Sequence, residues 1–297
     1  MGNVGYSGSL VLCYYHMKII VPIDFSPVSL NAANYAANIA KKLNGTLLLL
    51  HVYIPVVSGN NQVAALDHEL IENERKRTEE RLKNLGFNSG KWKDIQSICK
   101  TNVGNLADEI DLEARSEADS LIVMGLMDKT FWQDIFGRSA ADLVFEKTFY
   151  PLLIIPESAS TPEIQNILFI TDGDPDDLEP AASLSRMAKK LSARFSILRL
   201  SMTPSNSADQ SQGDISIETI NWTGKNRFNR LLEVVRKKQP QLIAYAENQR
   251  TALSRFMEGN PIERAAKRMN LPYICFNRTN IKSKGSKINP KFFVAPL

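Results

Sequence analysis

Short, almost continuous apolar runs alternate along the chain with longer amphipathic stretches. In runs such as TLLLLHVY (46–53) and SLIVMG (120–125), the side chains expected on either face of a strand are mostly apolar. This is typical of strands buried on both sides of a parallel sheet. The stretch SLNAANYAANIAKKL (29–43) has helical periodicity and predicts a helix that starts at a serine cap after Pro27. The highly charged stretch 66–86 predicts an outer helix that ends at Gly86. The first of these helices turns four side chains toward the sheet: Ala33, Ala36, Ala37 and Ile39.

The same order of elements occurs twice. KIIVPIDFS from Lys18 aligns with NILFITDGD from Asn166 at an offset of 148 residues, which places Asp24 on Asp172. Later in each half the offset is 121 residues, and it sets DSLIVMG on PQLIAYA and PLLIIPE on PYICFNR. The second copy is therefore shorter by 27 residues between its second and third strands. Matches at two fixed offsets over several segments indicate two homologous domains, each with five strands and four connecting helices.

The predicted fold class is α/β, with two tandem doubly wound domains of Rossmann-like type, each a five-stranded parallel sheet flanked by helices. Residues 1–16 precede the first recognisable strand and are expected to lie outside the fold. The domains are predicted at 17–157 and 164–278, with a polar linker at 158–163 and a basic C-terminal tail at 279–297. Arg278 and the lysines after it have no acidic neighbours in sequence, so we expect them to be solvated.

The amino-acid composition of the chain argues against several classes of function. The 297 residues are 43% apolar and 23% charged, as in ordinary globular proteins, and a net charge of +4 is too small to indicate nucleic acid. The chain contains no run of 18 apolar residues, which is the length that would indicate a membrane-spanning helix. The cysteines Cys13, Cys99 and Cys275 form no CxxC pair, which suits a reducing, cytoplasmic location. The three histidines lack metal-ligand spacing, and His51, inside a strand, is expected to be structural.

Several segments together resemble the universal stress protein family: residues 18–53, ADSLIVMG (118–125) and SAADLVFEKTFYPLLIIP (139–156). The resemblance implies an α/β fold with five parallel strands, frequent dimerisation and a role in stress response. It also implies that some members bind adenine nucleotides through a motif G-x-x-G-(nine residues)-G-S/T after the fourth strand. In such a loop backbone N–H groups surround the phosphates at a helix N-terminus, and glycine permits close approach.

On this resemblance the candidate nucleotide site of the first domain comprises Asp24, Gly125, Gly137, Arg138 and Ser139. Gly125 and Ser139 match the motif, whereas Asp128 and Arg138 replace its second and third glycines, and Gly137 lies one position early. A carboxylate at 128 repels phosphate, so we expect a degraded site that binds ATP weakly if at all. Asp24 has two open interpretations: a contact to a nucleoside, as the resemblance implies, or a strand-end cap that orders the next turn.

The second copy departs further from the motif. Its four motif positions are Ala246, Gln249, Gly259 and Asn260, and its first strand ends in the acidic loop DGDPDD (172–177). Four carboxylates there would repel a triphosphate. The loop also superficially matches the D-x-D loop of Mg²⁺-dependent phosphatases, which makes Asp172 and Asp174 a weak metal candidate. A solvated loop at a helix N-terminus is the simpler interpretation.

Because fifth strands meet across a two-fold axis in this family, the resemblance implies that PLLIIP and PYICF pair antiparallel within this chain. The expected assembly is an intramolecular pseudo-dimer that could dimerise further. The sequence does not identify a protein partner. The sequence lacks a Ser/His/Asp set and a metal-binding box, so we predict no catalytic residues and no enzymatic activity. Two further functions stay open: an adenine-nucleotide sensor using the first domain, and the phosphatase at 172–177.

Overall fold

The computed structural model describes residues 17–53, 68–87, 92–117, 119–126, 140–160, 163–202, 210–212, 215–247 and 260–278. The first half contains β1 (Lys18–Pro22), α1 (Pro27–Leu43), β2 (Thr46–Tyr53), α2 (His68–Phe87), β3 (Ser97–Val103), α3 (Leu106–Arg115), β4 (Ser120–Leu126), α5 (Ala140–Lys147) and β5 (Leu152–Pro156). The second half contains β6 (Asn166–Thr171), a short 3₁₀ helix (Pro175–Asp177), α6 (Leu178–Leu191), β7 (Arg194–Ser201), β8 (Gln210–Gln212), β9 (Ile215–Asn221), α7 (Arg227–Lys238), β10 (Leu242–Glu247), α9 (Pro261–Arg268) and β11 (Tyr273–Asn277).

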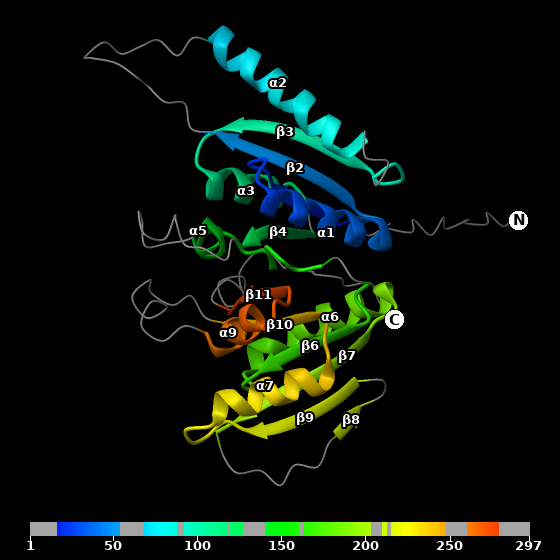
Figure 1. The fold of residues 1–297 in the computed structure, drawn as a ribbon, viewed down its shortest axis with the longest axis vertical. Helices are drawn as coiled ribbons and strands as arrows, with labels where there is room; N and C mark the ends of the chain where they lie inside the picture. Colours follow the sequence, from blue (N-terminus) through cyan, green and yellow to red (C-terminus); the bar gives the residue numbers. More distant parts are fainter. Residues whose placement is uncertain are drawn as a thin grey trace, which may run out of the picture.

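All eleven of these strands form one sheet, in the order β3-β2-β1-β4-β5-β11-β10-β6-β7-β9-β8 (Figure 1). Strands within each half pair in parallel, apart from β8, which runs antiparallel to β9. The halves join where β5 pairs antiparallel with β11, with Ile154 opposite Tyr273 and Leu152 opposite Cys275. This confirms the predicted pairing of the two fifth strands, and it covers two edges that would otherwise be open to other chains.

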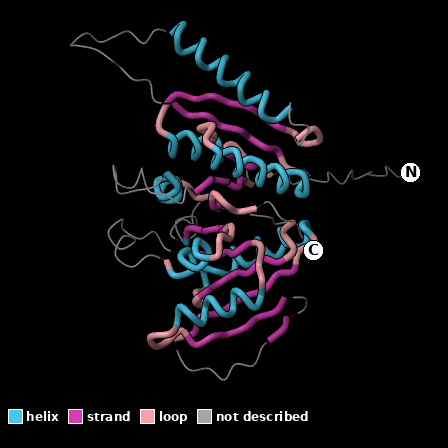
Figure 2. Tube along the Cα trace, viewed as in Figure 1, coloured by secondary structure: helices cyan, strands magenta, loops and turns pink. Residues whose placement is uncertain are grey.

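Helices, cyan in Figure 2, lie along the strands in both halves of the sheet. Two hydrophobic cores lie on opposite faces of this sheet, and each is shared by both halves. On one face α1 and α6 pack against the strands and against each other. On the other face α3 and α5 from the first half and α7 and α9 from the second all contribute residues to the second core. Because neither core stops at the boundary between the halves, the apolar burial that stabilises one half also depends on the other.

Helix α1 shows how a predicted helix is realised. Its predicted inward residues Ala33, Ala36, Ala37 and Ile39 are all buried. Its start differs from the prediction, because the cap is Ser26 and Pro27 occupies the first turn. Proline is tolerated there because the first turn needs no N–H for intrahelical bonding.

The second half does not repeat the first completely. The sequence predicts a helix between its second and third strands, but the described residues there form β8 instead. The shortening by 27 residues falls in this connection, and it corresponds to the region of α2 in the first half. None of the helices in the described ranges has the length and apolarity needed to cross a membrane.

Separating the halves tests how far they depend on each other. Expressed alone, residues 17–160 and 163–278 would each expose one central strand edge and half of both cores. We expect each fragment to aggregate or to form homodimers through β5 or β11, as judged by size-exclusion chromatography with light scattering. Co-expression should restore a soluble heterodimer. Two soluble, monomeric fragments would contradict the shared-core description.

Candidate functional site

The candidate sites lie at the carboxyl edge of the sheet. In each half two central strands, β1 with β4 and β6 with β10, lie side by side while their chain connections lead away in opposite directions. This is the position where ligands bind in open α/β sheets, outside the carboxyl ends of the strands. Asp24 follows β1 and Gly125 lies in β4, whereas Asp172 follows β6 and Ala246 lies in β10.

In the first half Asp24 organises the turn into α1. Its Oδ1 accepts hydrogen bonds from Ser26 N at 2.9 Å and Ser26 Oγ at 2.6 Å, and Ser26 Oγ in turn accepts from Ser29 N at 3.2 Å. Burial raises the pKa of Asp24, but hydrogen bonds with Ser26 and Ser29 lower it by more, so the net shift is downward. The strand-end cap accounts for these contacts, while the carboxylate still stands exposed at the edge.

Aromatic residues surround the same turn. Phe25 has a φ of 65°, in the left-handed region that costs a non-glycine residue about 1–2 kcal/mol. Its ring lies 3.8 Å from the Arg81 guanidinium on α2 and 5.3 Å from the His51 ring, contacts that favour this conformation. His51 Nδ1 lies 2.6 Å from Ile23 O, so the predicted structural role of this histidine is confirmed.

Gly125 has a packing requirement of its own. A Cβ at this position would lie 2.5 Å from Val28 Cγ1 and 2.6 Å from Val28 O, because β4 and the start of α1 approach closely here. Glycine at 125 is therefore explained without a phosphate. The other motif positions, Asp128, Gly137, Arg138 and Ser139, lie outside the described residues.

In the second half the carboxyl edge holds a buried guanidinium. Arg278, directly after β11, is only 6% exposed. Its Nε and Nη2 donate to the two Asp177 oxygens, both at 2.7 Å, and Nη2 also donates to Asp172 Oδ1 at 2.8 Å. Nη1 lies 3.6 Å from Asp174 Oδ2. One arginine thus neutralises much of the acidic loop.

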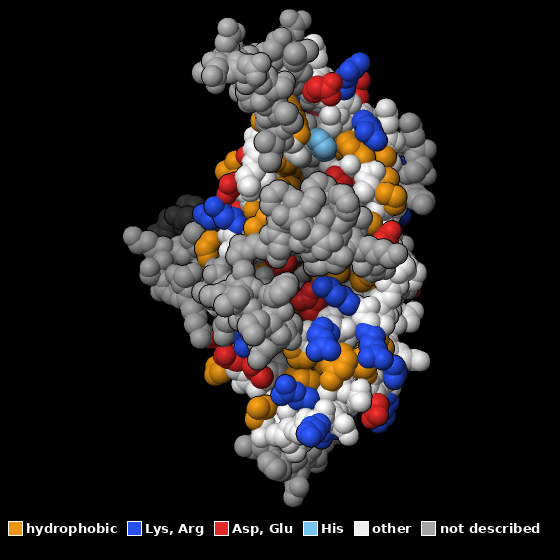
Figure 3. Space-filling view, turned by 60° about the vertical axis from the view of Figure 1, so that its left-hand side comes forward, with side chains coloured by type: hydrophobic (Ala, Val, Ile, Leu, Met, Phe, Trp, Pro, Cys, Tyr) orange, Lys and Arg blue, Asp and Glu red, His pale blue; other side chains and the backbone are white. Residues whose placement is uncertain are grey.

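This arrangement corrects one expectation from the sequence. Arg278 was expected to be solvated at the start of a basic tail, but it is buried and paired, while other Lys and Arg side chains gather on the surface of the second half (Figure 3). Asp172 and Asp174, the weak metal candidate, face this arginine instead. No group of potential metal ligands occurs among the described residues.

Arg278 changes the pKa of Asp172 in the acidic loop. Burial raises the pKa of Asp172, but its hydrogen bonds and charge interaction with Arg278 lower it by more, so the pKa falls below its usual range. The loop is also ordered internally: Asp174 N donates to Asp172 Oδ1, and Thr171 Oγ1 donates to Asp177 Oδ2. The loop therefore has partners within the protein and does not require a cation.

The repeat places a different residue at the matching position of the first half. The alignment of PLLIIPE with PYICFNR sets Glu157 against Arg278 and Asp24 against Asp172. The two carboxyl edges therefore differ in charge at this aligned position, where domain 2 has an arginine and domain 1 has a glutamate.

The end of β10 adds a further carboxylate to the second edge. Glu247 is buried, and its Oε2 accepts from Asn260 Nδ2 at 2.5 Å. Asn260 Oδ1 caps α9 by accepting from Ile262 N at 2.8 Å. In the second half the position of the motif Ser/Thr thus serves a helix cap.

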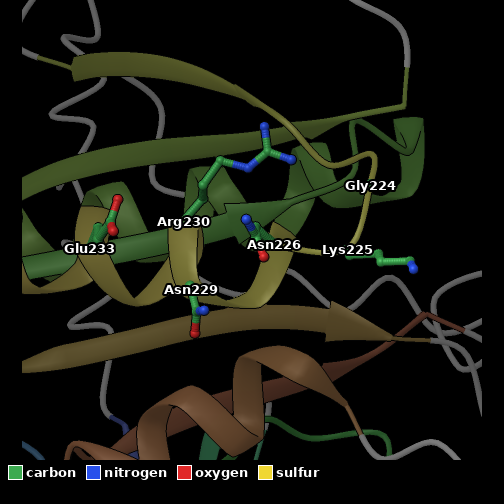
Figure 4. Close-up of a pocket in the computed structure, with 6 residues that line it drawn as sticks. All are labelled: Gly224, Lys225, Asn226, Asn229, Arg230 and Glu233. Atoms are coloured by element: carbon green, nitrogen blue, oxygen red, sulfur yellow. The ribbon is translucent and has the colours of Figure 1, made fainter.

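A separate hollow of about 530 Å³ lies at the start of α7. In Figure 4 the side chains of Lys225 and Asn229 point away from those of Arg230 and Glu233, so its polar groups do not converge on one point. Arg230 Nη2 is already bonded to Thr223 O. We assign no ligand to this hollow.

Comparisons with known proteins agree on one family. The model of the universal stress protein family matches residues 16–156. A universal stress protein of Methanocaldococcus jannaschii is 31% identical over 141 residues, 47% of this chain and 82% of the relative. The structure of a universal stress protein from Archaeoglobus fulgidus covers 88% of this chain and 96% of its own, with a TM-score of 0.64 and 16% identity. A protein of unknown function from Pseudomonas aeruginosa PAO1 covers 91% and 96%, with a TM-score of 0.50 and 13% identity. The structural matches support the fold.

Removing the buried guanidinium should destabilise the protein. Arg278→Met leaves the Asp177 carboxylate buried and unpaired, so we expect the free energy of unfolding in urea to fall by about 3–5 kcal/mol. Adding Asp177→Asn should recover part of the loss. Arg268→Met, on the exposed face of α9, is the matched control and should stay within about 0.5 kcal/mol of the parent. A loss below about 1 kcal/mol for Arg278→Met would contradict a buried ion pair.

The cap at Asp24 gives a pH-dependent prediction. Ser26→Ala removes one donor to Asp24 and the cap of α1, so the pKa of Asp24 should rise toward 3.8 and stability at pH 7 should fall by about 1 kcal/mol. A lowered carboxylate pKa contributes stability above the unfolded-state pKa, which is lost as the pH falls through the folded-state value. The Asp24-linked part of the difference between variant and parent should therefore shrink below about pH 4. Carboxyl NMR titration and thermal unfolding measure both effects, and an unchanged Asp24 pKa would refute the assignment.

Proposed function

Because the chain belongs to the universal stress protein family, we propose that it is a non-enzymatic stress-response protein with two unequal domains. Domain 1 (17–157) keeps a degraded nucleotide site, and domain 2 (164–278) has none. The observation that carries the proposal is the Arg278 guanidinium at the carboxyl edge of domain 2, bonded to Asp172 and Asp177.

In domain 2 a nucleotide would meet both steric and electrostatic obstacles. Arg278 is already bonded to carboxylates and buried, so it offers no cation to a phosphate without breaking those bonds. A phosphate brought to this edge would also face Asp172, Asp174 and Glu247. Charges at such short distances interact strongly where water is excluded, so repulsion disfavours any anionic ligand.

In domain 1 the carboxyl edge differs at the position of Arg278. Asp24 is exposed at the switch point of the sheet, and the residue matching Arg278 is Glu157. These features support a residual ligand site and keep an adenine-nucleotide sensor as the second candidate function. Asp128 and Arg138 argue for weak binding, because one adds a negative charge and the other a side chain where close approach is needed.

Chemistry at the acidic loop has little support. A phosphatase mechanism would need Asp172 as a nucleophile and Asp174 beside a bound Mg²⁺. Asp172 instead accepts a hydrogen bond from Arg278 at 2.8 Å, which stabilises its negative charge and reduces its nucleophilicity. The contacts of the loop therefore favour a structural role.

Calorimetry with ATP tests the proposal. We expect the parent to bind at domain 1 with a dissociation constant on the order of 0.1–1 mM or weaker. The double variant Asp128→Gly with Arg138→Gly should bind more tightly, because it removes the repulsive charge and frees the backbone. Gln249→Gly, at the position in domain 2 that matches Asp128, is the control and should leave the affinity unchanged.

Two results would contradict this description of domain 1. Micromolar affinity in the parent would mean that Gly137 and Arg138 form a working loop, and the sensor function would then replace the degraded site. No gain in the double variant would mean that more of the pocket has been lost than these two positions.

A further inference from the structure

Two helix pairs at matching positions of the repeat carry opposite charge. Helices α3 and α5 precede the last two strands of domain 1, and α7 and α9 precede the last two strands of domain 2. Both pairs pack on the same face of the sheet. The sequences of α3 and α5, LADEIDLEAR and AADLVFEK, have six acidic residues and two basic ones. Those of α7 and α9, RFNRLLEVVRKK and PIERAAKR, have two acidic residues and eight basic ones.

The positive charge of α7 and α9 is not a requirement of the fold. These helices pack on the sheet through buried apolar side chains such as Leu231, Val235 and Ala265. Helices α3 and α5 pack in the same way, although most of their charged residues are acidic. A helix dipole favours cations in the last turn, but Lys225 and Arg227 lie at the start of α7, where the dipole disfavours them. The basic residues therefore need another explanation.

Most of these cations are exposed and have no acidic partner. Lys238 pairs with Glu218 at 2.9 Å. Lys267 pairs with Glu263, so these two cations are already neutralised. Of the acidic residues on the two helices, only Glu233 is exposed. Figure 3 shows Lys and Arg side chains gathered over this half of the molecule. We call the exposed cations that pair with no carboxylate of the described residues the basic face: Lys225, Arg227, Arg236, Lys237, Arg264 and Arg268.

Aromatic rings hold two arginines of the basic face in place. Arg227 Cζ lies 5.7 Å from the centre of the Trp222 ring, and Arg264 Cζ lies 4.8 Å from the centre of the Phe228 ring. Both rings pack against the core beneath α7 and α9. A guanidinium stacked on a fixed ring loses less freedom when it binds a phosphate. The two side chains are therefore positioned before a ligand arrives.

The basic face lacks the apolar side chains that other partners would need. Peripheral membrane helices insert an apolar face, and protein interfaces have an apolar centre that is depleted of lysine. Single-stranded nucleic acids need exposed rings for stacking. Interfaces with double-stranded DNA are polar, basic and centred on phosphates. Neither α7 nor α9 contributes to the exposed large apolar residues of the described ranges, which are Ile98, Val103, Leu112, Leu143, Leu178 and Met202.

We propose that the basic face binds double-stranded DNA through its phosphates, without reading the base sequence. Helices α7 and α9 contact each other, so their cations form one surface over two helices. The net charge of +4 does not oppose this role, because the acidic helices of domain 1 offset the basic helices of domain 2 in the total. Such a surface attracts a polyanion over a distance. The proposal does not depend on the candidate nucleotide site.

Fluorescence anisotropy of a labelled DNA duplex of about 20 base pairs tests the basic face in the full chain. We expect a dissociation constant on the order of 1–10 μM at about 50 mM salt. If about four cations contact phosphates, the affinity should fall about 100-fold between about 50 and 200 mM salt. Arg236→Gln with Lys237→Gln should weaken binding at least about tenfold and reduce the salt slope by about 2. A duplex of different sequence should bind equally well.

Lys189→Gln with Lys190→Gln is the matched control. These exposed lysines lie on α6, which packs on the opposite face of the sheet, and the change removes the same charge. The control should bind the duplex as the parent does. Equal weakening in both double variants would mean that net charge alone drives binding, and it would overturn the proposal.

The position of the contact can also be checked on the second helix. Arg264→Gln with Arg268→Gln on α9 repeats the test, and it keeps the proposal open to refutation if circular dichroism shows that the α7 variant is unfolded. An unchanged affinity in a folded α7 variant would overturn the proposal. The DNA contact would then lie elsewhere, for instance at the lysines of residues 279–297.

Other partners give distinct results. An RNA duplex that binds at least about tenfold more tightly than DNA would overturn the choice of DNA. Phosphatidylserine vesicles should not sediment the protein at about 150 mM salt, and sedimentation that depends on Arg236 and Lys237 would identify a membrane surface instead. No change of anisotropy in the parent at about 50 mM salt would overturn the proposal outright. Any ATP affinity of domain 1 should be the same in all these variants, so the two proposals can fail separately.

Discussion

The antiparallel pairing of β5 with β11 determines how the two halves of the chain lie against each other. It joins two parallel sheets into one and brings α1 against α6 on one face. On the other face it gathers residues of α5 and α9 into one core. It also brings the end of β11 to α5, so that Asn277 reaches Phe145. A protein that formed the same contact between two identical subunits would repeat each of these contacts twice, whereas this chain has changed the two sides independently.

The two halves of the repeat differ in charge at one aligned pair of positions. Residue 157 is a glutamate and residue 278 an arginine, and each follows the last strand of its half. The arginine allows domain 2 to hold Asp172, Asp174 and Asp177 together, where uncompensated charges would be costly. The glutamate gives domain 1 no positive charge at this aligned position, and Asp24 there accepts hydrogen bonds from Ser26. The two edges thus differ in local charge, although the strands that form them are arranged alike.

Much of the fold was predictable because it is governed by local periodicity and by the internal repeat. The apolar runs identify the strands, and the repeat identifies the pair β5 and β11. The cap of α1 was placed too late because the sequence offers two serines, and only the structure shows that Ser26 bonds to both Asp24 and Ser29 N. Arg278 was misassigned because its sequence neighbours are basic, while its partners lie about a hundred residues away. One signal was present: four carboxylates at one edge require a counter-charge, and carboxyl ends of neighbouring parallel strands meet there. The loop 127–139 remains a prediction from the motif alone.

Gly125 shows why a partial motif must be weighed against packing. Because glycine has no Cβ, α1 can approach β4 closely at Val28. The fold requires this close approach whether or not a phosphate is bound. A glycine held by packing would survive after loss of a ligand, so its presence carries little information about binding. Asp24 is similar, since it accepts hydrogen bonds from Ser26, the cap of α1, independently of any nucleoside. The sequence adds one further indication in domain 1, because Asp128 and Arg138 replace the second and third glycines of the motif.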